Sequence, residues 1–378
     1  MTVRLIHTSD WQIGKVFRFM DSTSMGLLQE ARLEAITRLG QLAKEHGARH
    51  ILVAGDVYDM EALSPLSINQ PIERMRAFRD IHWHLLPGNH DPNRPNGLWD
   101  RILATGLPNN VHIHVSPTPV VLDKIGVVLL PAPLVYRHTI GDPTAYMDEA
   151  SVPGGLIRVG IAHGTISGFG SEDREVANYI SPDRPVRAKL SYLALGDWHG
   201  QKKINDRCWY SGTPEQDAFD VENAGKALLV EIEGPDASPS VTPIETGQYT
   251  WTRLSRQINS REDIDLLENA LRGLSEDPIR ILLHLTVEGG VSLQDRLYFN
   301  RTIVEGVSAA FRFLRVNDRH LFPNPTLEDL DQIDRGGFVR AAAEELKRLS
   351  LEGEAGSVAS EALQRLYIEH MKLKAGQT

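Results

Sequence analysis

Short runs of apolar residues alternate with longer mixed stretches along the first 130 residues of the chain. The runs are rich in Val, Ile and Leu and have the length of buried strands; they cover 3–8, 50–54, 81–86, 111–115 and 125–130. Residues 24–46 instead carry Leu and Ala at near-helical spacing, and Gly47 ends that pattern. This alternation of strands and helices predicts an α/β fold with largely parallel strands.

Similar apolar runs continue to residue 232 and predict further strands at 157–162, 191–195, 207–211 and 226–232. A Pro- and Ser-rich turn region is predicted at 234–243. From about residue 249 the pattern restarts on a smaller scale, with strands predicted at 249–256, 279–287 and 311–316. Helices are predicted from about residue 292 and from Ser260, where Asp263 completes a capping box.

The C-terminal part is charged and helical in pattern. Pro323 and Pro325 interrupt regular structure ahead of helices predicted at 328–350 and 357–374. We therefore expect three parts, at 1–247, 248–320 and 321–378.

The bulk composition fits a protein with a large core. The chain has 378 residues, of which 41% are hydrophobic, and its only cysteine, Cys208, excludes a disulfide framework and a cysteine-based zinc module. No signal peptide and no apolar run of about 18 residues is recognisable, so a soluble, cytoplasmic protein is expected. The net charge of −10 argues against diffuse coating of nucleic acid, but not against local binding.

Polar residues that can bind metal follow five of the apolar runs. Ligands bind at the carboxyl ends of strands in open α/β sheets because the loops converge there. The residues are Asp10 and Gln12 in SDWQ, Asp56 in AGDVYD, Asn89, His90 and Asp91 in PGNHD, His163 in AHG, and Asp197 and His199 in GDWHG. A single Gly-Asp is usually a turn, and a single histidine is usually structural, as we infer for His82, His84, His112 and His114. Five such stretches together predict a metal site.

These five stretches resemble the pattern D-x-H, G-D, G-N-H-D/E, G-H and G-H-x-H of the calcineurin-like metallophosphoesterase superfamily. The opening LIHTSDWQIG, the VAGDVYD and LPGNHD blocks and the small α/β unit most resemble the SbcD nucleases, which act in the repair of DNA double-strand breaks. The resemblance implies two β-sheets sandwiched between helices, a small α/β capping domain at 248–320 and a helical C-terminal tail after FPNPTLEDL.

The resemblance also implies a site with two divalent ions. In it Asp56 bridges both ions, Asp10, Gln12 and His199 hold one, and Asn89, His163 and Asp197 hold the other. His90 protonates or positions the leaving oxygen, and Asp91 orients His90 or its loop. Two cations about 3.5 to 4 Å apart suit phosphodiester hydrolysis.

Two positions depart from the family pattern, because Gln12 and Asp197 stand where histidines are usual. Both place oxygen donors, which favour Mn²⁺, with Mg²⁺ as the alternative, over zinc. The other interpretation is that Gln12 only holds a water and that one site is weak. Asp59 stands where the archaeal and eukaryotic relatives carry a histidine, which leaves the balance of exonuclease and endonuclease action open.

The function expected is a two-metal phosphodiesterase that cleaves DNA, as an exonuclease or endonuclease subunit in DNA repair. The alternatives are a small-molecule phosphodiesterase or phosphatase, and a DNA-break-binding subunit with weakened catalysis. The resemblance implies a homodimer and a coiled-coil ATPase of the SbcC type as partner. One face of the last helix, with Leu363, Leu366, Tyr367 and His370, either docks onto that ATPase or folds back on the phosphoesterase domain.

Overall fold

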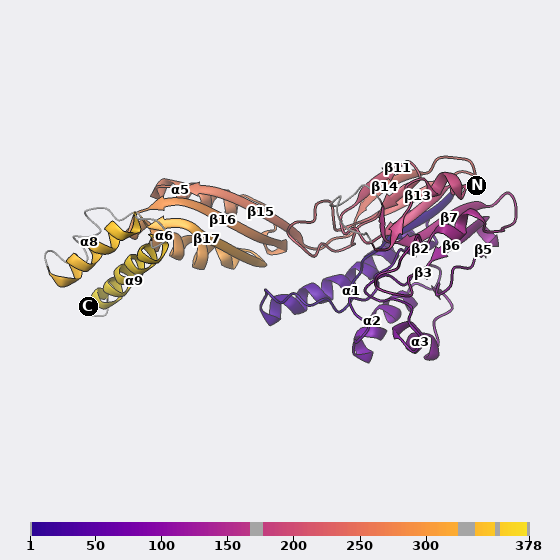
Figure 1. Cartoon of the computed structure of the whole chain (residues 1–378), viewed down its shortest axis with the longest axis horizontal. Coiled ribbons are helices and arrows are strands. Elements are labelled where there is room, and N and C mark those ends of the chain that lie inside the picture. The colour runs from indigo at the N-terminus through magenta and orange to yellow at the C-terminus, as the bar shows by residue number, and fades with distance from the viewer. Residues whose placement is uncertain (1, 167–176, 324–336, 352–355, 376–378) are drawn as a thin grey trace. The chain divides into compact units, whose positions relative to one another are not determined.

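Two compact units make up the chain, Met1–Tyr249 and Thr250–Thr378 (Figure 1). The computed structural model describes residues 2–166, 177–323, 337–351 and 356–375. Within these residues no helix is long and apolar enough to cross a membrane.

Two six-stranded sheets form the first unit. The first sheet has the order β14 (Ser240–Glu245), β13 (Lys226–Ile232), β1 (Val3–Thr8), β2 (His50–Val53), β3 (His82–Leu85) and β4 (Val111–Ile113). The second has the order β11 (Lys202–Asn205), β12 (Cys208–Tyr210), β10 (Tyr192–Gly196), β7 (Ile157–His163), β6 (Val127–Ala132) and β5 (Val120–Leu122). A two-stranded pair joins β8 (Thr165–Ile166) to β9 (Tyr179–Ile180).

The two sheets pack through one shared core. Strands β1 to β4 pair in parallel, as do β6, β7 and β10, so their carboxyl ends lie at one edge of each sheet. Leu5 and Leu52 from the first sheet pack against Leu129, Ile161 and other buried aliphatic side chains of the second. Burial of these side chains from two facing sheets is what makes the unit a sandwich.

Helices cover the outer face of the first sheet. The helices α1 (Ser22–Glu45), α2 (Pro65–Arg76) and α3 (Leu98–Ala104) bury Ile36, Met75 and Trp99 against Trp83 of β3. Asp21 caps α1 by accepting from the backbone of Thr23 and Ser24. On the second sheet lies the 3₁₀ turn η2 (Ala145–Asp148), whose Met147 packs with Leu130 and Leu193; the short α4 (Arg184–Arg187) contacts η2, and the 3₁₀ turn η1 (Asp123–Ile125) connects β5 to β6. The predicted α/β fold with two packed sheets between helices is confirmed.

Five histidine side chains form a stacked row along β2, β3 and β4. Their rings stack at centroid distances between 5.1 and 5.3 Å; the row consists of His50, His82, His84, His112 and His114. Nδ1 of His50 lies 3.0 Å from Nε2 of His84, and Nδ1 of His84 lies 3.1 Å from Nε2 of His114. Burial, with the neighbouring imidazoles, lowers the pKa of His50 and of His114 to about 4, so these two rings are neutral at pH 7.

The prediction of a turn over residues 234–243 is wrong for its second part. Strand β14 begins at Ser240 and pairs antiparallel with β13, with Pro243 opposite Leu228. A proline is tolerated there because β14 is the edge strand of its sheet.

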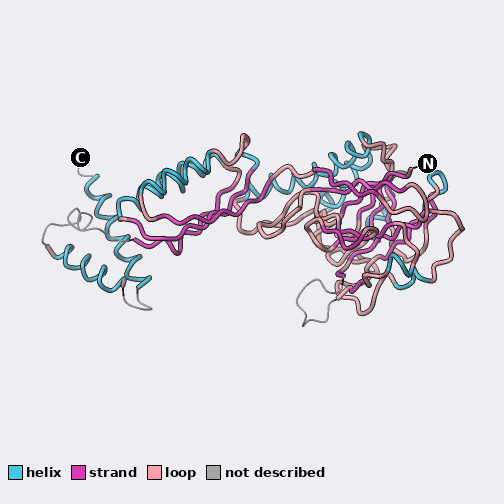
Figure 2. The backbone as a smooth tube through the Cα atoms, turned by 90° about the horizontal axis from the view of Figure 1, so that it is seen from above, coloured by secondary structure: helices cyan, strands magenta, loops and turns pink. Residues whose placement is uncertain are grey.

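The second unit is built on a parallel three-stranded sheet, β15 (Thr250–Ile258), β16 (Ile281–Val291) and β17 (Phe313–Pro323) (Figure 2). The helix α5 (Arg261–Arg272) connects β15 to β16, and its predicted capping box of Ser260 and Asp263 is present. The connection from β16 to β17 holds α6 (Leu293–Phe299), the π-helical turn η4 (Asn300–Gly306) and the 3₁₀ turn η5 (Val307–Ala310), and η3 (Pro278–Arg280) precedes β16. Pro323 ends β17 rather than lying in a linker.

The C-terminal helices α8 (Phe338–Ser350) and α9 (Gly356–Ala375) pack into this second unit. Leu363 and Tyr367 of α9 are buried with Ala343 of α8 and Leu293 of α6. Two side chains of the face predicted to dock onto a partner are therefore covered within their own unit, and docking of the tail stays a prediction. Pro325 and the predicted start of a helix at 328 lie outside the described residues.

Candidate metal centre

The candidate ligands come from loops that the sheet topology brings to one edge. Asp10 follows β1, Asp56 follows β2 and Asn89 follows β3, three neighbouring parallel strands. In the second sheet His163 ends β7, and Asp197 follows the neighbouring parallel strand β10. The loops converge because parallel strands end at the same edge.

Four candidate ligands have left-handed backbones. The φ angles are 53° at Asp10, 42° at Gln12, 53° at Asp56 and 108° at Asp197. Such conformations cost roughly 1–3 kcal/mol each in residues other than glycine and persist only where surrounding contacts hold them. Here the backbone N–H of Asp10 donates to Gly55 O at 3.1 Å, and that of Gln12 donates to Asp56 O at 2.9 Å. These bonds lock the loops after β1 and β2 together.

A buried group of two carboxylates and one imidazole forms the middle of the site. Asp10, Asp56 and His163 each place one ligand atom within 4.8 Å of the others. His163 donates through Nδ1 to Ala54 O at 2.8 Å, and its Nε2 lies 3.5 Å from Oδ1 of Asp56. This hydrogen bond fixes the tautomer that a metal-binding imidazole needs.

Asn89 provides the test of whether a cation fits. Its amide oxygen lies 2.8 Å from Nε2 of His163, and it faces acceptor atoms only. Turning the amide over would let its nitrogen donate to both carboxylate oxygens of Asp56 and to His163. With the oxygen inward, an amide oxygen, a carboxylate and an imidazole nitrogen meet at one place, a donor set that suits a divalent cation. The residues present therefore fit a metal.

The electrostatics of this group favour added positive charge. Burial would lower the pKa of His163, but the carboxylates of Asp56, Asp10 and Asp197 raise it to about 9. Burial also raises the pKa of Asp10, and the neighbouring Asp56 carboxylate adds to that shift. Buried carboxylates this close need cations between them.

On the other side of Asp10 lies His199. Its Nε2 is 3.9 Å from Oδ1 of Asp10, and its Nδ1 pairs with Asp217 at 2.9 Å. Asp217 is buried, and although burial alone would raise its pKa, His199, Arg32 and Lys15 hold that pKa well below its usual range. Asp217 therefore orients His199 as a carboxylate, with Nε2 turned toward the site.

Gln12 lies in the site with an unexpected orientation. Its amide oxygen, the atom expected to bind metal, accepts a hydrogen bond from Nζ of Lys15 at 2.8 Å. Its amide nitrogen lies 3.2 Å from Nε2 of His199. The amide has to turn over before its oxygen can share an ion with His199.

Asp197 lies beside His163, and His90 lies beside Asp56. Oδ1 of Asp197 is 3.8 Å from Nε2 of His163, and Oδ2 accepts a hydrogen bond from Thr165. His90 donates from Nδ1 to Asp59 O at 2.9 Å, which leaves Nε2 4.0 Å from Oδ2 of Asp56. The His90 side chain is 29% exposed, so it can reach a group bound at the site.

Asp91 points away from the middle of the site. Its carboxylate accepts from the backbone N–H groups of Gly88 at 2.7 Å and Tyr58 at 3.0 Å. It thereby ties the loop after β3 to the loop after β2.

Three further residues, Lys15, Thr165 and Asp217, hold the ligands in place and are not among the predicted site residues. Lys15 lies close to the SDWQ motif and Thr165 directly follows AHG, and this proximity is the only feature of the sequence that could have pointed to them. Asp217 follows no apolar run, and only the fold brings it to His199.

Comparisons with known proteins identify what the chain is similar to. Residues 3–177 match the family model of the calcineurin-like phosphoesterases. The chain is 25% identical over 275 residues to the SbcD subunit of the nuclease SbcCD from Bacillus subtilis (strain 168), a match that covers 63% of this chain and 67% of that protein. The crystal structure of TT1561 of Thermus thermophilus matches with 12% identity and a TM-score of 0.41, over 65% of this chain and all of that one. Residues 3–177 therefore form a calcineurin-like phosphoesterase domain, and the chain is similar to an SbcD-type nuclease subunit.

Proposed function

We propose that this protein is a two-metal phosphodiesterase that hydrolyses DNA, as the nuclease subunit of a DNA repair complex. The observation that carries the proposal is the buried group of Asp10, Asp56 and His163, whose ligand atoms all lie within 4.8 Å of one another. The similarity to a protein named as a nuclease subunit supports DNA as the substrate.

Each residue has a role in this proposal. Two divalent ions, when bound, would neutralise a phosphodiester and lower the pKa of a water. Asp56 would contribute to both ions, because its carboxylate lies between the Asn89 side and the Asp10 side. Asp10, Gln12 and His199 would hold one ion, and Asn89, His163 and Asp197 the other.

His90 and Asp91 would not bind metal. His90 would protonate or position the leaving oxygen through Nε2, since Nδ1 is held by Asp59 O. Asp91 would keep the loop of His90 in place through its bonds to Gly88 and Tyr58.

We propose Mn²⁺ as the metal, with Mg²⁺ as the alternative. Asp10, Asp56, Asn89 and Asp197 offer oxygen donors and outnumber the imidazoles of His163 and His199. At matched free-ion levels, turnover should be highest with Mn²⁺ and low with Zn²⁺. Higher turnover with Zn²⁺ would contradict this metal assignment.

The test offers purified protein with Mn²⁺ single-stranded, blunt-ended and hairpin DNA beside a nitrophenyl phosphodiester. We expect cleavage of at least one DNA form, and its loss in Asp56→Ala. Cleavage of the small diester with none of the DNA forms would favour a small-molecule phosphodiesterase. DNA binding with neither cleavage would favour a binding subunit with weakened catalysis, the function suggested by the Lys15 contact to Gln12.

The remaining expectations concern assembly. We propose residues 1–247 as the catalytic domain, 248–320 as a capping domain and 321–378 as the tail, in a cytoplasmic homodimer. A coiled-coil ATPase of the SbcC type is the proposed partner. Because the inner face of α9 is covered, its docking would use exposed apolar side chains of the same unit, such as Phe338, Leu351 and Val358. Phe338→Asp should then abolish ATP-stimulated DNA processing without changing cleavage of the small diester.

A further inference from the structure

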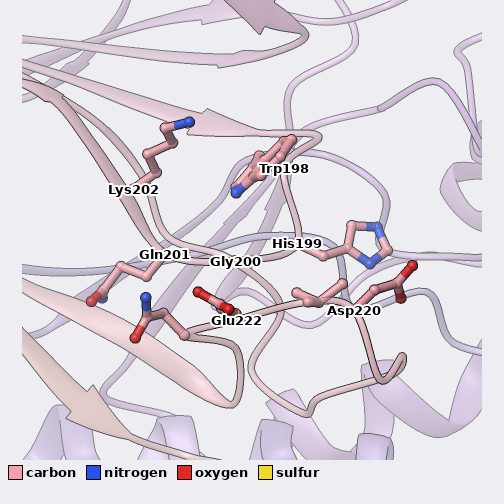
Figure 3. Close-up of a pocket in the computed structure, with 9 residues that line it drawn as sticks. Trp198, His199, Gly200, Gln201, Lys202, Asp220 and Glu222 are labelled. Atoms are coloured by element: carbon pink, nitrogen blue, oxygen red, sulfur yellow. The ribbon is translucent and has the colours of Figure 1, made fainter. Parts of the chain in front are cut away.

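A pocket of about 550 Å³ adjoins the candidate metal centre. Its size lies within the roughly 300–1,000 Å³ of small-molecule sites. His199 lines it and also reaches Asp10, at 3.9 Å, so the pocket and the metal centre share one side chain (Figure 3). The segments 198–202 and 220–223 form its walls and are joined by a hydrogen bond from Gln201 N to Asn223 O at 2.9 Å.

Trp198 is the prominent apolar group of this pocket. It lies in the chain between Asp197 and His199, and 51% of its surface is exposed. Nζ of Lys202 lies 4.9 Å from the centre of its indole ring. Figure 3 shows Trp198 and Lys202 on one side of the pocket, with Asp220 and Glu222 on the other. A large, half-exposed aromatic ring beside a cation is a surface on which flat rings stack.

The carboxylates in the pocket wall determine which aromatic ligands fit it. Asp220 and Glu222 would repel a phosphate, but their carboxylates can accept hydrogen bonds from the amino groups of adenine, cytosine or guanine. A phosphate would instead be drawn to the adjoining metal centre. The two sites together match a nucleotide, with its base in the pocket and its phosphodiester at the metals.

We infer that this pocket binds a nucleobase of the DNA strand being cut, stacked on Trp198, next to the scissile phosphate. The inference rests on the proposed function, because it names a binding site for part of that substrate. Stacking tolerates every base, whereas the carboxylates favour bases with an exocyclic amino group. Thymine should therefore be the least favoured base at this position.

Trp198 provides its own probe. Of the six tryptophans, Trp11, Trp83, Trp99 and Trp251 are buried and Trp209 is half-buried, so emission accessible to acrylamide comes mainly from Trp198. We expect a single-stranded oligonucleotide, added to the full chain in EDTA, to quench this emission and protect it from acrylamide. An oligonucleotide of the same length without bases should do neither. Trp198→Phe should remove the accessible emission.

Binding affinity gives the second readout. In EDTA, Trp198→Ala should weaken oligonucleotide binding roughly 5- to 150-fold, as expected for the loss of one stacked base, and Trp198→Phe should weaken it less. Leu266→Ala, which removes an exposed apolar side chain of α5 in the second unit (60% exposed), should leave the affinity unchanged.

The outcomes separate this inference from the nuclease proposal. Equal protection by the oligonucleotide without bases, or unchanged affinity of Trp198→Ala, overturns the base pocket even if the protein cleaves DNA with Mn²⁺. Base-dependent protection supports the pocket even if only small diesters are cleaved, because the measurement needs no turnover.

Discussion

At the residue scale, Asp56 and His90 lie close together yet have different proposed tasks. Asp56 is buried beside Asp10 and His163 in the group that could hold a metal ion. His90 instead donates from Nδ1 to Asp59 O, so its Nε2 remains available to a bound group. His90→Ala should therefore lower turnover of the nitrophenyl diester by at least about 10²-fold, within the usual range for an acid or base, while metal affinity stays unchanged. Asp56→Ala should lose metal binding itself. Calorimetric titration with Mn²⁺ separates the two, and loss of metal in His90→Ala would make His90 a ligand.

Gly88 should be needed for the metal centre although it carries no side chain. A Cβ built at this position would lie 2.2 Å from Oδ1 of Asp56 and 2.4 Å from its backbone nitrogen. Gly88→Ala should therefore displace Asp56 and weaken Mn²⁺ binding at least 10-fold, or about 1.4 kcal/mol, in calorimetry.

The matched control for Gly88 is Gly26 in α1, where a Cβ meets nothing within 4 Å. Gly26→Ala should bind Mn²⁺ normally and raise the free energy of unfolding by about 0.5–1 kcal/mol, because alanine loses less entropy in a helix. Normal Mn²⁺ affinity in Gly88→Ala would show that the loop after β3 can move aside.

At the element scale, the C-terminal helices stabilise the small unit through one apolar cluster. Leu363 is fully buried there with Leu293 of α6 and Ala343 of α8. Leu363→Ala should lower the free energy of opening of α8 and α9, measured by amide hydrogen exchange, by about 2–5 kcal/mol.

The exposed Val358 of the same helix gives the control, because Val358→Ala should change this opening energy by less than about 0.5 kcal/mol. Both variants should retain Mn²⁺-dependent cleavage of small diesters, because every candidate ligand lies in the first unit. Equal opening energies in Leu363→Ala and the unmodified protein would mean that the cluster does not hold these helices.

Elements with a clear apolar period of their own could be predicted from the sequence, because their pattern does not depend on a distant strand or helix. The strand β1 and the helix α1 have clear apolar periods, and the polar residues after each strand marked the site. Helix α2 has buried residues at Ile68, Ile72 and Met75, but Pro65 and Pro71 obscure its pattern. Strand β14 has one buried residue, and pairing with β13 decides its conformation. The orientation of Gln12 could not be predicted because Lys15 and Asp217 set it.

For the whole molecule, the histidine row makes stability depend on pH. His50 and His114 have a pKa lowered by burial from 6.5 to about 4. Above pH 6.5 both histidines are neutral in the folded and in the unfolded chain, so they do not change the free energy of unfolding. As the pH falls from 6.5 to about 4, only the unfolded chain gains protons, and each site removes up to about 3 kcal/mol of stability.

Urea unfolding at pH 7.5 and pH 5 measures this loss. His114→Leu should show a smaller loss between the two pH values than the unmodified protein, because it removes one of these sites. His138→Leu, at an exposed position in a loop, should show the same loss as the unmodified protein. An unchanged pH dependence in His114→Leu would mean that other groups cause the acid sensitivity.

The histidine row also couples tautomers across three strands. Each contact in the series His50, His84, His114 joins an Nδ1 to an Nε2, so it holds one proton between two nitrogens. Once one ring carries its proton on Nδ1, its neighbour must present a bare Nε2 and carry its own proton on Nδ1. The three imidazoles therefore share one direction of polarity, and replacing His84 would release both of its neighbours to choose a tautomer independently.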